Sequence, residues 1–173
     1  MSGGFRVRPE REGDVGAIAT VVREAFGREA EAGLVGDLRE AGALEVSLVA
    51  EAEDGAIVGQ VALSPVTIDG VDGGGRWLGL APLAVRADRQ RQGIGAALVL
   101  GGLAAADANG AGLVVVLGEP AYYARSGFAP AARHGLAAPW PVPEEAFMAR
   151  LAAGAKAPPA GVVRYHAAFD RLA

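Results

Sequence analysis

The sequence predicts one α+β domain, in which helices flank a mixed and mostly antiparallel central sheet. Three observations support this class. The chain has 173 residues, the length of one ordinary domain, with no apparent repeat or linker. Hydrophobic residues make up 51% of it and charged residues 21%, as in a folded chain. Its apolar segments alternate between helical periodicity and short strand-like runs, so helices and strands are expected within one unit.

Composition and charge exclude several classes of protein. No apolar run reaches the roughly 20 residues that cross a bilayer, and the N-terminus lacks a hydrophobic leader. Cysteine is absent, and His134 and His166 are far apart in the sequence, so we expect no disulfide and no metal site. The net charge of −4 and the scattered basic residues argue against nucleic-acid binding. We therefore expect a cytoplasmic protein with neither membrane nor nucleic acid as a partner.

The first half of the chain predicts a strand, two helices and three further strands. Asp14 is a candidate N-cap for the first helix, which presents an apolar face. The second helix is weaker because it contains two glycines. Glu53-Asp54-Gly55 is a hairpin turn between two β-rich runs. The expected strands are 5–9, 45–52, 57–68 and 77–85, the second helix is 29–40, a second turn spans 69–75, and the apolar face comprises Ile18, Val21, Val22, Ala25 and Phe26.

The second half predicts a long helix, a buried strand and a more irregular tail. The helix begins at Gly93-Ile94-Gly95 and ends at a cap formed by Asn109-Gly110. The continuous apolar run 113–117 is typical of a strand buried on both faces. The tail is expected to hold a short helix at 122–125, a proline-rich bend at 139–143, a helix near 144–152 and a last strand at 162–169.

The pair Gly93 and Gly95 carries the main functional signal. Glycines that open a helix expose main-chain N–H groups at the positive end of its dipole, where a phosphate binds well. A dinucleotide fingerprint would require a third glycine where Leu98 stands, and a P-loop would require lysine after Gly95, where Ala96 stands. The alternative is structural, in that both glycines simply let the helix pack closely on the sheet.

The surrounding residues resemble a known superfamily. Gln90-Arg91-Gln92-Gly93-Ile94-Gly95 resembles the Gln/Arg-x-x-Gly-x-Gly/Ala signature of the GNAT N-acetyltransferases. The segment 123–128 is similar to the Tyr-x-x-x-Gly-Phe element of that superfamily, and the segment 6–14 is similar to its first strand and helix start. The resemblance covers a core of residues 5–128 within a single acyl-CoA N-acyltransferase domain spanning 1–173. Residues 129–173 form a C-terminal extension, and its part from His134 onward is similar to a subgroup of bacterial acetyltransferases.

This resemblance implies acetyl-CoA as the acyl donor and a primary amine as the acceptor, by direct attack in a ternary complex. The main chain from Arg91 to Ala96 would hold the diphosphate, and the pantetheine arm would lie along a splayed central strand that Pro82 helps to interrupt. A backbone N–H near Leu83 or Ala84 would polarise the thioester carbonyl. The implied donor-binding residues are Leu83, Ala84, Val85, Gln90, Arg91, Gln92, Gly93, Ile94, Gly95 and Ala96. Arg86, Arg89 and Arg91 are candidates to attract the phosphates, or are simply solvated.

Tyr123 stands where the family places a tyrosine that protonates the departing thiolate. A phenol can serve as this acid if it lies within hydrogen-bond reach of the sulfur. The alternative is that Tyr123 is an aromatic core contact beside Phe128, a role that we assign to Tyr122.

The general base is not evident. Many relatives carry a glutamate on the central strand, but the segment 77–85 contains no acidic residue. Glu119 is the candidate that we retain, with Glu51 and Glu53 as further candidates, although each carboxylate is also explained as a solvated surface group. We exclude His134 and His166, because a lone histidine is usually structural. Trp140 and Phe147 are expected to cover the core or to shape the acceptor pocket.

Two other functions remain open. A non-catalytic acyl-CoA-binding or regulatory domain would explain the missing acid, and an unrelated phosphate-binding domain would require both motif matches to be accidental. The acceptor, a small molecule or a peptide amine, is not specified by the sequence. The choice between acetyl and longer acyl donors is not specified either, and homodimer formation is left open.

Overall fold

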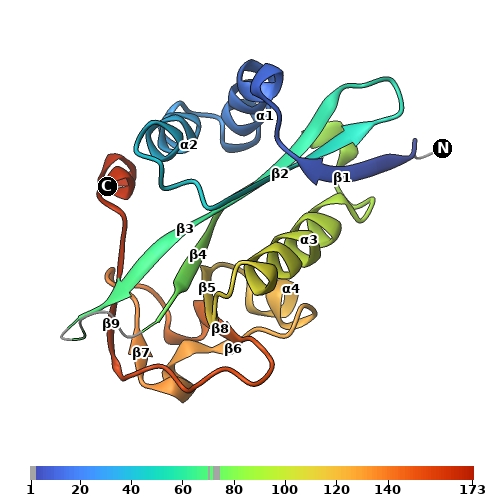
Figure 1. Ribbon diagram of the computed structural model, residues 1–173. Coiled ribbons are helices and arrows are strands. Elements are labelled where there is room, and N and C mark those ends of the chain that lie inside the picture. Colours follow the sequence, from blue (N-terminus) through green and yellow to red (C-terminus); the bar gives the residue numbers. More distant parts are fainter. Residues whose placement is uncertain (1–2, 70, 72–74) are drawn as a thin grey trace.

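The structure, a computed structural model, describes residues 3–69, 71 and 75–173. One twisted sheet runs through the molecule, and helices cover both of its faces (Figure 1). Helices α1 and α2 lie on one face together with the C-terminus, and α3 and α4 lie on the other. The predicted α+β class, with a mixed and mostly antiparallel sheet between helices, is confirmed.

The element bounds follow the sequence pattern closely in the first 128 residues. The helices are α1 (Val15–Phe26), α2 (Ala30–Glu40), α3 (Ile94–Ala108) and α4 (Pro120–Ala124). The strands are β1 (Phe5–Pro9), β2 (Val46–Ala52), β3 (Ile57–Ile68), β4 (Trp77–Val85), β5 (Leu113–Leu117), β6 (Ala129–Pro130), β7 (Leu136–Ala137), β8 (Phe147–Leu151) and β9 (Gly161–Tyr165). Short 3-10 turns are η1 (Glu12–Asp14), η2 (Ala87–Arg89), η3 (Ala131–His134), η4 (Glu144–Ala146) and η5 (Ala167–Leu172).

Along the sheet the strand order is β1-β2-β3-β4-β5-β8-β6, and β9 pairs with both β3 and β7. The pairs β4–β5 and β7–β9 are parallel, and the other described pairs are antiparallel. Strands β8 and β9 belong to the predicted C-terminal extension. This part of the chain therefore completes the same sheet as the core.

The central pair β4 and β5 separates partway along its length. Pairing between the two strands runs only from Trp77 to Gly79 on β4. Beyond that point β4 continues along β3, where a bulge places an extra residue opposite Ala62. Pro82 lies in this bulge and has no N–H to donate. The splayed strand pair that the resemblance implies is therefore present.

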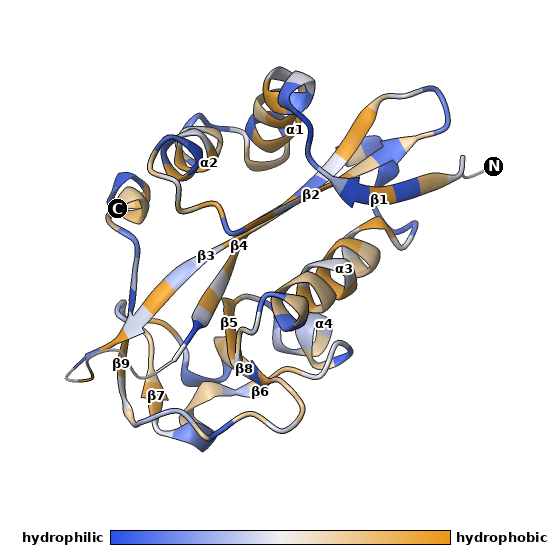
Figure 2. Cartoon of the chain, in the orientation of Figure 1, coloured by the Kyte–Doolittle hydropathy of each residue, from blue (hydrophilic) through white to orange (hydrophobic). Residues whose placement is uncertain are grey.

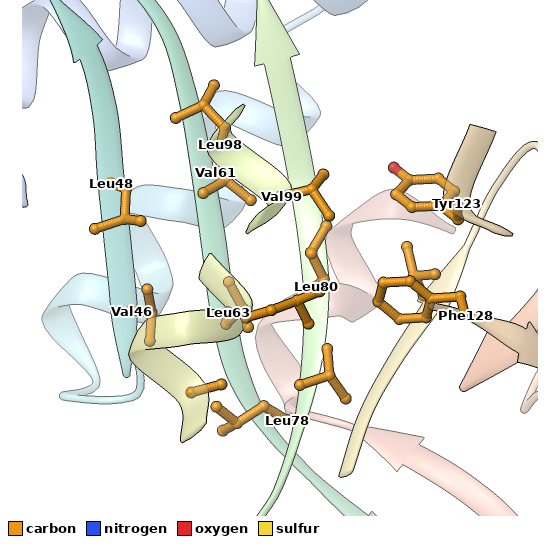
Figure 3. Close-up of a cluster of buried hydrophobic side chains, with 14 of the residues drawn as sticks. Val46, Leu48, Val61, Leu63, Leu78, Leu80, Leu98, Val99, Tyr123 and Phe128 are labelled. Atoms are coloured by element: carbon orange, nitrogen blue, oxygen red, sulfur yellow. The ribbon is translucent and has the colours of Figure 1, made fainter. Parts of the chain in front are cut away.

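The largest hydrophobic cluster lies between α3 and the sheet. Leu98 and Val99 of α3 face Val61 and Leu63 of β3, and all four side chains are buried (Figure 3). Hydrophobic residues follow the central strands and the helix sides that face them (Figure 2). Tyr123 and Phe128 extend this cluster toward the splayed end of the sheet. Burial of this cluster fixes α3, and with it the start of the helix, relative to β4.

Several local expectations were wrong. Asp14 precedes α1 as predicted, but its carboxylate makes no capping bond to that helix. It accepts hydrogen bonds from Arg8 Nη1 at 2.7 Å and from the Arg11 N–H at 2.7 Å instead. Phe26 is 42% exposed, so it does not belong to the buried face of α1. The Asp14 carboxylate thus binds Arg8 in place of the free N–H groups at the start of α1.

The tail contains more strand than the sequence suggested. The segment predicted as a helix near 144–152 is the turn η4 followed by β8, because its main chain pairs with the open edge of β5. The last strand ends at Tyr165, and η5 takes its place over the remaining residues. The predicted turn at 69–75 lies mostly outside the described residues. Within the described ranges, we find no helix whose length and apolar character would let it traverse a bilayer.

Candidate functional site

A first pocket of about 610 Å³ opens where β4 ends and α3 begins. Residues from the end of β4, the connecting loop, the first turn of α3 and the helix α4 surround it. The lining residues are Leu83, Val85, Gln90, Arg91, Gly93, Gly95, Ala96, Tyr122 and Arg125. Seven of the ten residues that the sequence analysis expects at a donor site line this pocket, and the other two lining residues are Tyr122 and Arg125.

The main chain at the start of α3 is prepared for an anion. The first bond of this helix runs from the Ala97 N–H to the Gly93 carbonyl, so the N–H groups of Ile94, Gly95 and Ala96 have no acceptor within the helix. Gly93 has φ +84° and Arg91 has φ +61°, both in the left-handed region. Helix N-terminal N–H groups beside a pocket form a favourable site for phosphate oxygens.

The surroundings of the two glycines argue against the purely structural explanation. A Cβ on Gly93 would meet no atom within 4 Å, and a Cβ on Gly95 would overlap Tyr122 Oη. Neither glycine is required for packing on the sheet, since a Cβ on Gly95 would lie at an ordinary contact distance of 3.7 Å from Val85 Cγ2 of β4. Close packing of α3 on the sheet occurs further along, where a Cβ on Gly102 would lie 3.1 Å from Leu63 Cδ1. The glycine pair therefore shapes the pocket, not the helix–sheet contact.

Two arginines supply positive charge to this pocket. Arg91 lies in the loop, and the Arg125 guanidinium lies over the Tyr122 ring, 5.5 Å from its centroid. Arg125 was not predicted, since nothing in its sequence context distinguishes it from a solvated residue. Arg86 is paired with Asp88 at 2.6 Å, and Arg89 donates to Gln92 Oε1 at 2.9 Å. These two arginines do not line the pocket.

Three predicted residues have other surroundings. The side chains of Ala84 and Ile94 are buried in hydrophobic clusters on opposite faces of the sheet. Gln92 is held by Arg89. Gln90 does line the pocket, and its Nε2 donates to the Val85 carbonyl at 3.2 Å. Ala84 and Ile94 can therefore take part in ligand binding only through their main chain.

A second pocket of about 390 Å³ lies on the other side of the splayed strands. Its walls come from the α1–α2 region, the bulged part of β4, the end of β5 and the C-terminal segment. The lining residues are Phe26, Glu31, Leu34, Leu80, Ala81, Pro82, Leu83, Leu117, Tyr123, Trp140, Tyr165, Phe169 and Leu172. Leu83 lines both pockets, so they meet along the part of β4 that no longer pairs with β5.

Tyr123 lies at the edge of the second pocket and is 9% exposed. Its ring packs edge-on against Phe128 with centroids 5.7 Å apart, and its oxygen points away from Phe128 (Figure 3). Burial, with a smaller contribution from Tyr122, raises the pKa of the Tyr123 phenol to about 12. The phenol is therefore protonated at neutral pH. Tyr122, which we expected in the core, is half-buried and lines the first pocket.

Glu31 is a feature of the second pocket that the sequence analysis missed. It lies in the first turn of α2 and is 6% exposed, although a carboxylate on an amphipathic helix is normally solvated. Arg28 Nε donates to Glu31 Oε1 at 2.8 Å. The helix pattern alone marks this position as polar and gives no sign that it lines a pocket together with the C-terminal segment.

The other acidic and histidine candidates lie elsewhere. Glu119 is exposed and lines neither pocket. Glu51 accepts a hydrogen bond from Arg8 Nε at 2.6 Å, and this bond holds the pKa of its carboxyl below the usual range. Glu53 lies with Glu51 near β1, away from both pockets. His166 Nδ1 accepts from the Ala168 N–H at 3.0 Å, a structural role.

The chain is similar to proteins of one family. A family profile described as an acetyltransferase (GNAT) domain matches residues 44–130. The uncharacterized N-acetyltransferase YhbS of Escherichia coli K12 is 43% identical over 167 residues, which are 96% of this chain and 99% of that protein. A second relative from the same strain, the uncharacterized N-acetyltransferase YjhQ, is 38% identical over 135 residues, or 76% of this chain and 74% of the relative.

Solved structures show the same similarity. The crystal structure of E. coli YhbS in complex with CoA superposes with a TM-score of 0.91 at 40% identity, covering 100% of this chain and 96% of that one. A GNAT family acetyltransferase from Brucella melitensis, in complex with acetyl-CoA, has a TM-score of 0.81 at 36% identity and covers 97% of this chain and 99% of that one.

Proposed function

The chain belongs to the GNAT family of N-acetyltransferases, and from this premise we propose that it transfers the acetyl group of acetyl-CoA to a primary amine held in the second pocket. The proposal has one main support, which is the position of Leu83 in the lining of both pockets. A donor and an acceptor bound on the two sides of the splay would meet there. Such proximity alone contributes much of a rate enhancement.

In this proposal the first pocket holds the diphosphate of the donor. The N–H groups of Ile94, Gly95 and Ala96 donate to its oxygens, and Arg91 and Arg125 balance its charge. The CoA and acetyl-CoA complexes of the two similar structures support this choice of ligand. In this proposal the diphosphate is therefore bound by the N-terminal end of α3, with its helix dipole, and by the guanidinium groups of Arg91 and Arg125.

The pantetheine arm would follow the free edge of β4 from Val85 toward Leu83. This edge is open because β5 no longer pairs with β4 beyond Gly79. An extended ligand that adds to a sheet edge gains main-chain hydrogen bonds without a dedicated side chain. A main-chain N–H near Leu83 would then polarise the thioester carbonyl.

The reaction is a direct attack. The acceptor binds as an ammonium ion and first releases one proton to solvent. The neutral amine then forms a bond to the acetyl carbon, the carbon–sulfur bond breaks, and the nitrogen loses a second proton, which returns through solvent to the Tyr123 phenolate. We assign Tyr123 as the acid that protonates the leaving thiolate, because its protonated phenol lies at the edge of the pocket that shares Leu83. Glu119 lines neither pocket, so we give it no step in this mechanism.

The test combines binding and turnover. Calorimetry should show binding of acetyl-CoA, and release of free CoA should depend on an added primary amine. Arg91→Gln should raise the Kd for acetyl-CoA about tenfold, the loss of one charge-assisted contact. Arg86→Gln is the matched control, since Arg86 is an equally charged neighbour that pairs with Asp88 outside the pocket.

Two outcomes would contradict the proposal. Equal effects of the two arginine substitutions would mean that general charge, and not the first pocket, attracts the donor. Binding of acetyl-CoA without CoA release on any amine would favour the non-catalytic acyl-CoA-binding function.

A further inference from the structure

We infer that the acceptor carries a single cationic amino group on a flat apolar body, and that Glu31 recognises its charge. This inference rests on the proposed function, because it identifies the class of amine that the second pocket takes. It is drawn from the composition of the walls and from the one acidic side chain among them.

The walls of the second pocket are apolar, and one side is aromatic. The rings of Trp140 and Tyr165 lie 4.9 Å apart between centroids with an interplanar angle of 37°, and Tyr165 and Phe169 lie 4.8 Å apart at 59°. Trp140 is 38% exposed, so part of its ring remains available for contact. Neighbouring ring faces favour a flat hydrocarbon group and also attract a cation. A volume of about 390 Å³ suits a small ligand, not a polymer segment.

The charges of the residues that line the second pocket narrow the class of acceptor amine further. Among the lining residues Glu31 is the single acidic one, and none of them is basic. A polyamine or an aminoglycoside carries several positive charges, but the lining residues offer only one carboxylate to pair with them. Arg28 donates to both oxygens of the Glu31 carboxylate, from Nε to Oε1 at 2.8 Å and from Nη2 to Oε2, so an ammonium group would share this carboxylate with Arg28. The Glu31 side chain is 7% exposed and that of Arg28 is 55% exposed, so solvent reaches the cation of this pair more than its anion. An ammonium group in this apolar site would experience weak solvent screening of its attraction to Glu31.

The residues that line the two pockets come from different parts of the sequence, so acceptor specificity and donor binding can vary separately. All residues that line the first pocket fall within the segment 44–130 that matches the family profile. Seven residues of the second pocket fall outside that segment: Phe26, Glu31, Leu34, Trp140, Tyr165, Phe169 and Leu172. Figure 1 shows α2 beside the C-terminus, where these parts of the chain meet. Arg171 fixes this contact by donating from Nε to Asp37 Oδ2 at 2.9 Å.

Two substitutions with different expected effects on the KM for the amine test the role of Glu31. With 2-phenylethylamine as acceptor, Glu31→Gln should raise the KM for the amine about tenfold and leave the KM for acetyl-CoA unchanged. Arg28→Gln should not raise the KM for the amine, because it removes the competing cation and leaves the carboxylate in place. Thermal unfolding of both variants checks that each is folded. If Arg28→Gln raised the KM as much as Glu31→Gln, the pair would be merely structural and the inference would be overturned.

A panel of acceptors tests the class of amine. We expect kcat/KM for 2-phenylethylamine to exceed that for spermidine at least tenfold, and Glu31→Gln to reduce this preference. Equal or better turnover of spermidine, or a loss in Glu31→Gln confined to kcat, would overturn the inference while leaving acetyl transfer intact. Failure of every amine in the panel to release CoA would instead contradict the proposed function itself. The two failures are therefore distinguishable.

Discussion

The rings of Tyr122 and Tyr123 pack edge to face, with centroids 5.0 Å apart and planes at 84°. Although they are adjacent in α4, Tyr122 lines the first pocket and Tyr123 lines the second. One short helix thus contributes an aromatic side chain to each side of the splayed strands. A substitution that moves either ring is therefore expected to shift the other ring as well.

Removing the Tyr123 hydroxyl should affect chemistry more than binding. Tyr123→Phe keeps the ring and its contacts, so the Kd for acetyl-CoA should stay within about twofold while kcat falls about 100-fold, the usual contribution of a general acid. Steady-state kinetics and calorimetry check this split. In the matched change Tyr122→Phe any effect should fall on the Kd of the donor. Unchanged kcat in Tyr123→Phe would remove this residue from the mechanism.

The pH dependence of kcat should reflect the raised pKa of Tyr123. With a pKa of about 12, the phenol stays protonated through neutral and moderately alkaline pH. We therefore expect no falling limb of kcat between about pH 8 and about pH 10, whereas a phenol of ordinary pKa would be half ionised at about pH 10. A decline with a midpoint near 10 that disappears in Tyr123→Phe would contradict the burial of this group.

The same burial makes a prediction for stability in alkali. Burial raises the pKa values of Tyr122, Tyr123 and Tyr165 above their ordinary value. The unfolded chain ionises first, so the contribution of these groups is complete below about pH 10 and is lost as the pH rises further. Thermal unfolding should show Tm falling above about pH 10, and less steeply in Tyr123→Phe.

Because Gly95 lies close to Tyr122, the effect of Gly95→Ala on acetyl-CoA binding should be reversed by a second substitution, Tyr122→Phe. A Cβ on Gly95 would overlap Tyr122 Oη, but it would lie 3.6 Å from Tyr122 Cζ and 3.7 Å from Val85 Cγ2, both ordinary contacts. Gly95→Ala should therefore displace the Tyr122 ring and weaken acetyl-CoA binding about tenfold. Adding Tyr122→Phe removes the overlapping atom and should restore most of the affinity in calorimetry. Two substitutions whose losses simply add would show that the overlap is not the cause.

Asp14 should stabilise the N-terminal part of the fold. Hydrogen bonding to Arg8 holds the pKa of its carboxyl below the usual range. Asp14→Asn should lower the free energy of unfolding by about 2 kcal/mol at pH 7. Because the folded pKa is depressed, this contribution is present above the unfolded pKa of about 4 and is lost as the pH falls through the folded value. Asp88→Asn, in an exposed pair, is the control for urea unfolding, and an equal loss there would contradict the prediction.

The sequence predicted the fold well where local signals and long-range packing agree. The apolar run at 113–117 and the glycine-led helix at 94–108 are strong signals, and both elements form as expected. The segment near 144–152 lacked such a signal, because its strand depends on pairing with the open edge of β5. A local sequence pattern does not predict pairing between strands that lie far apart in the chain.

The same distinction applies to the candidate site. The loop from Gln90 to Ala96 is contiguous in sequence, so a motif is enough to indicate it. The second pocket joins Glu31 of α2 to Trp140 and Phe169 of the tail, and only the folded chain brings these together. Arg125 and Glu31 could not be identified in advance, since each is an ordinary charged residue until its surroundings are known.

The two pockets draw on different parts of the sequence. Phe169 and Leu172 of η5 line the second pocket, far in sequence from the residues around Gly93 that line the first. Sequence divergence in η5 can therefore reshape the second pocket while the first keeps its lining.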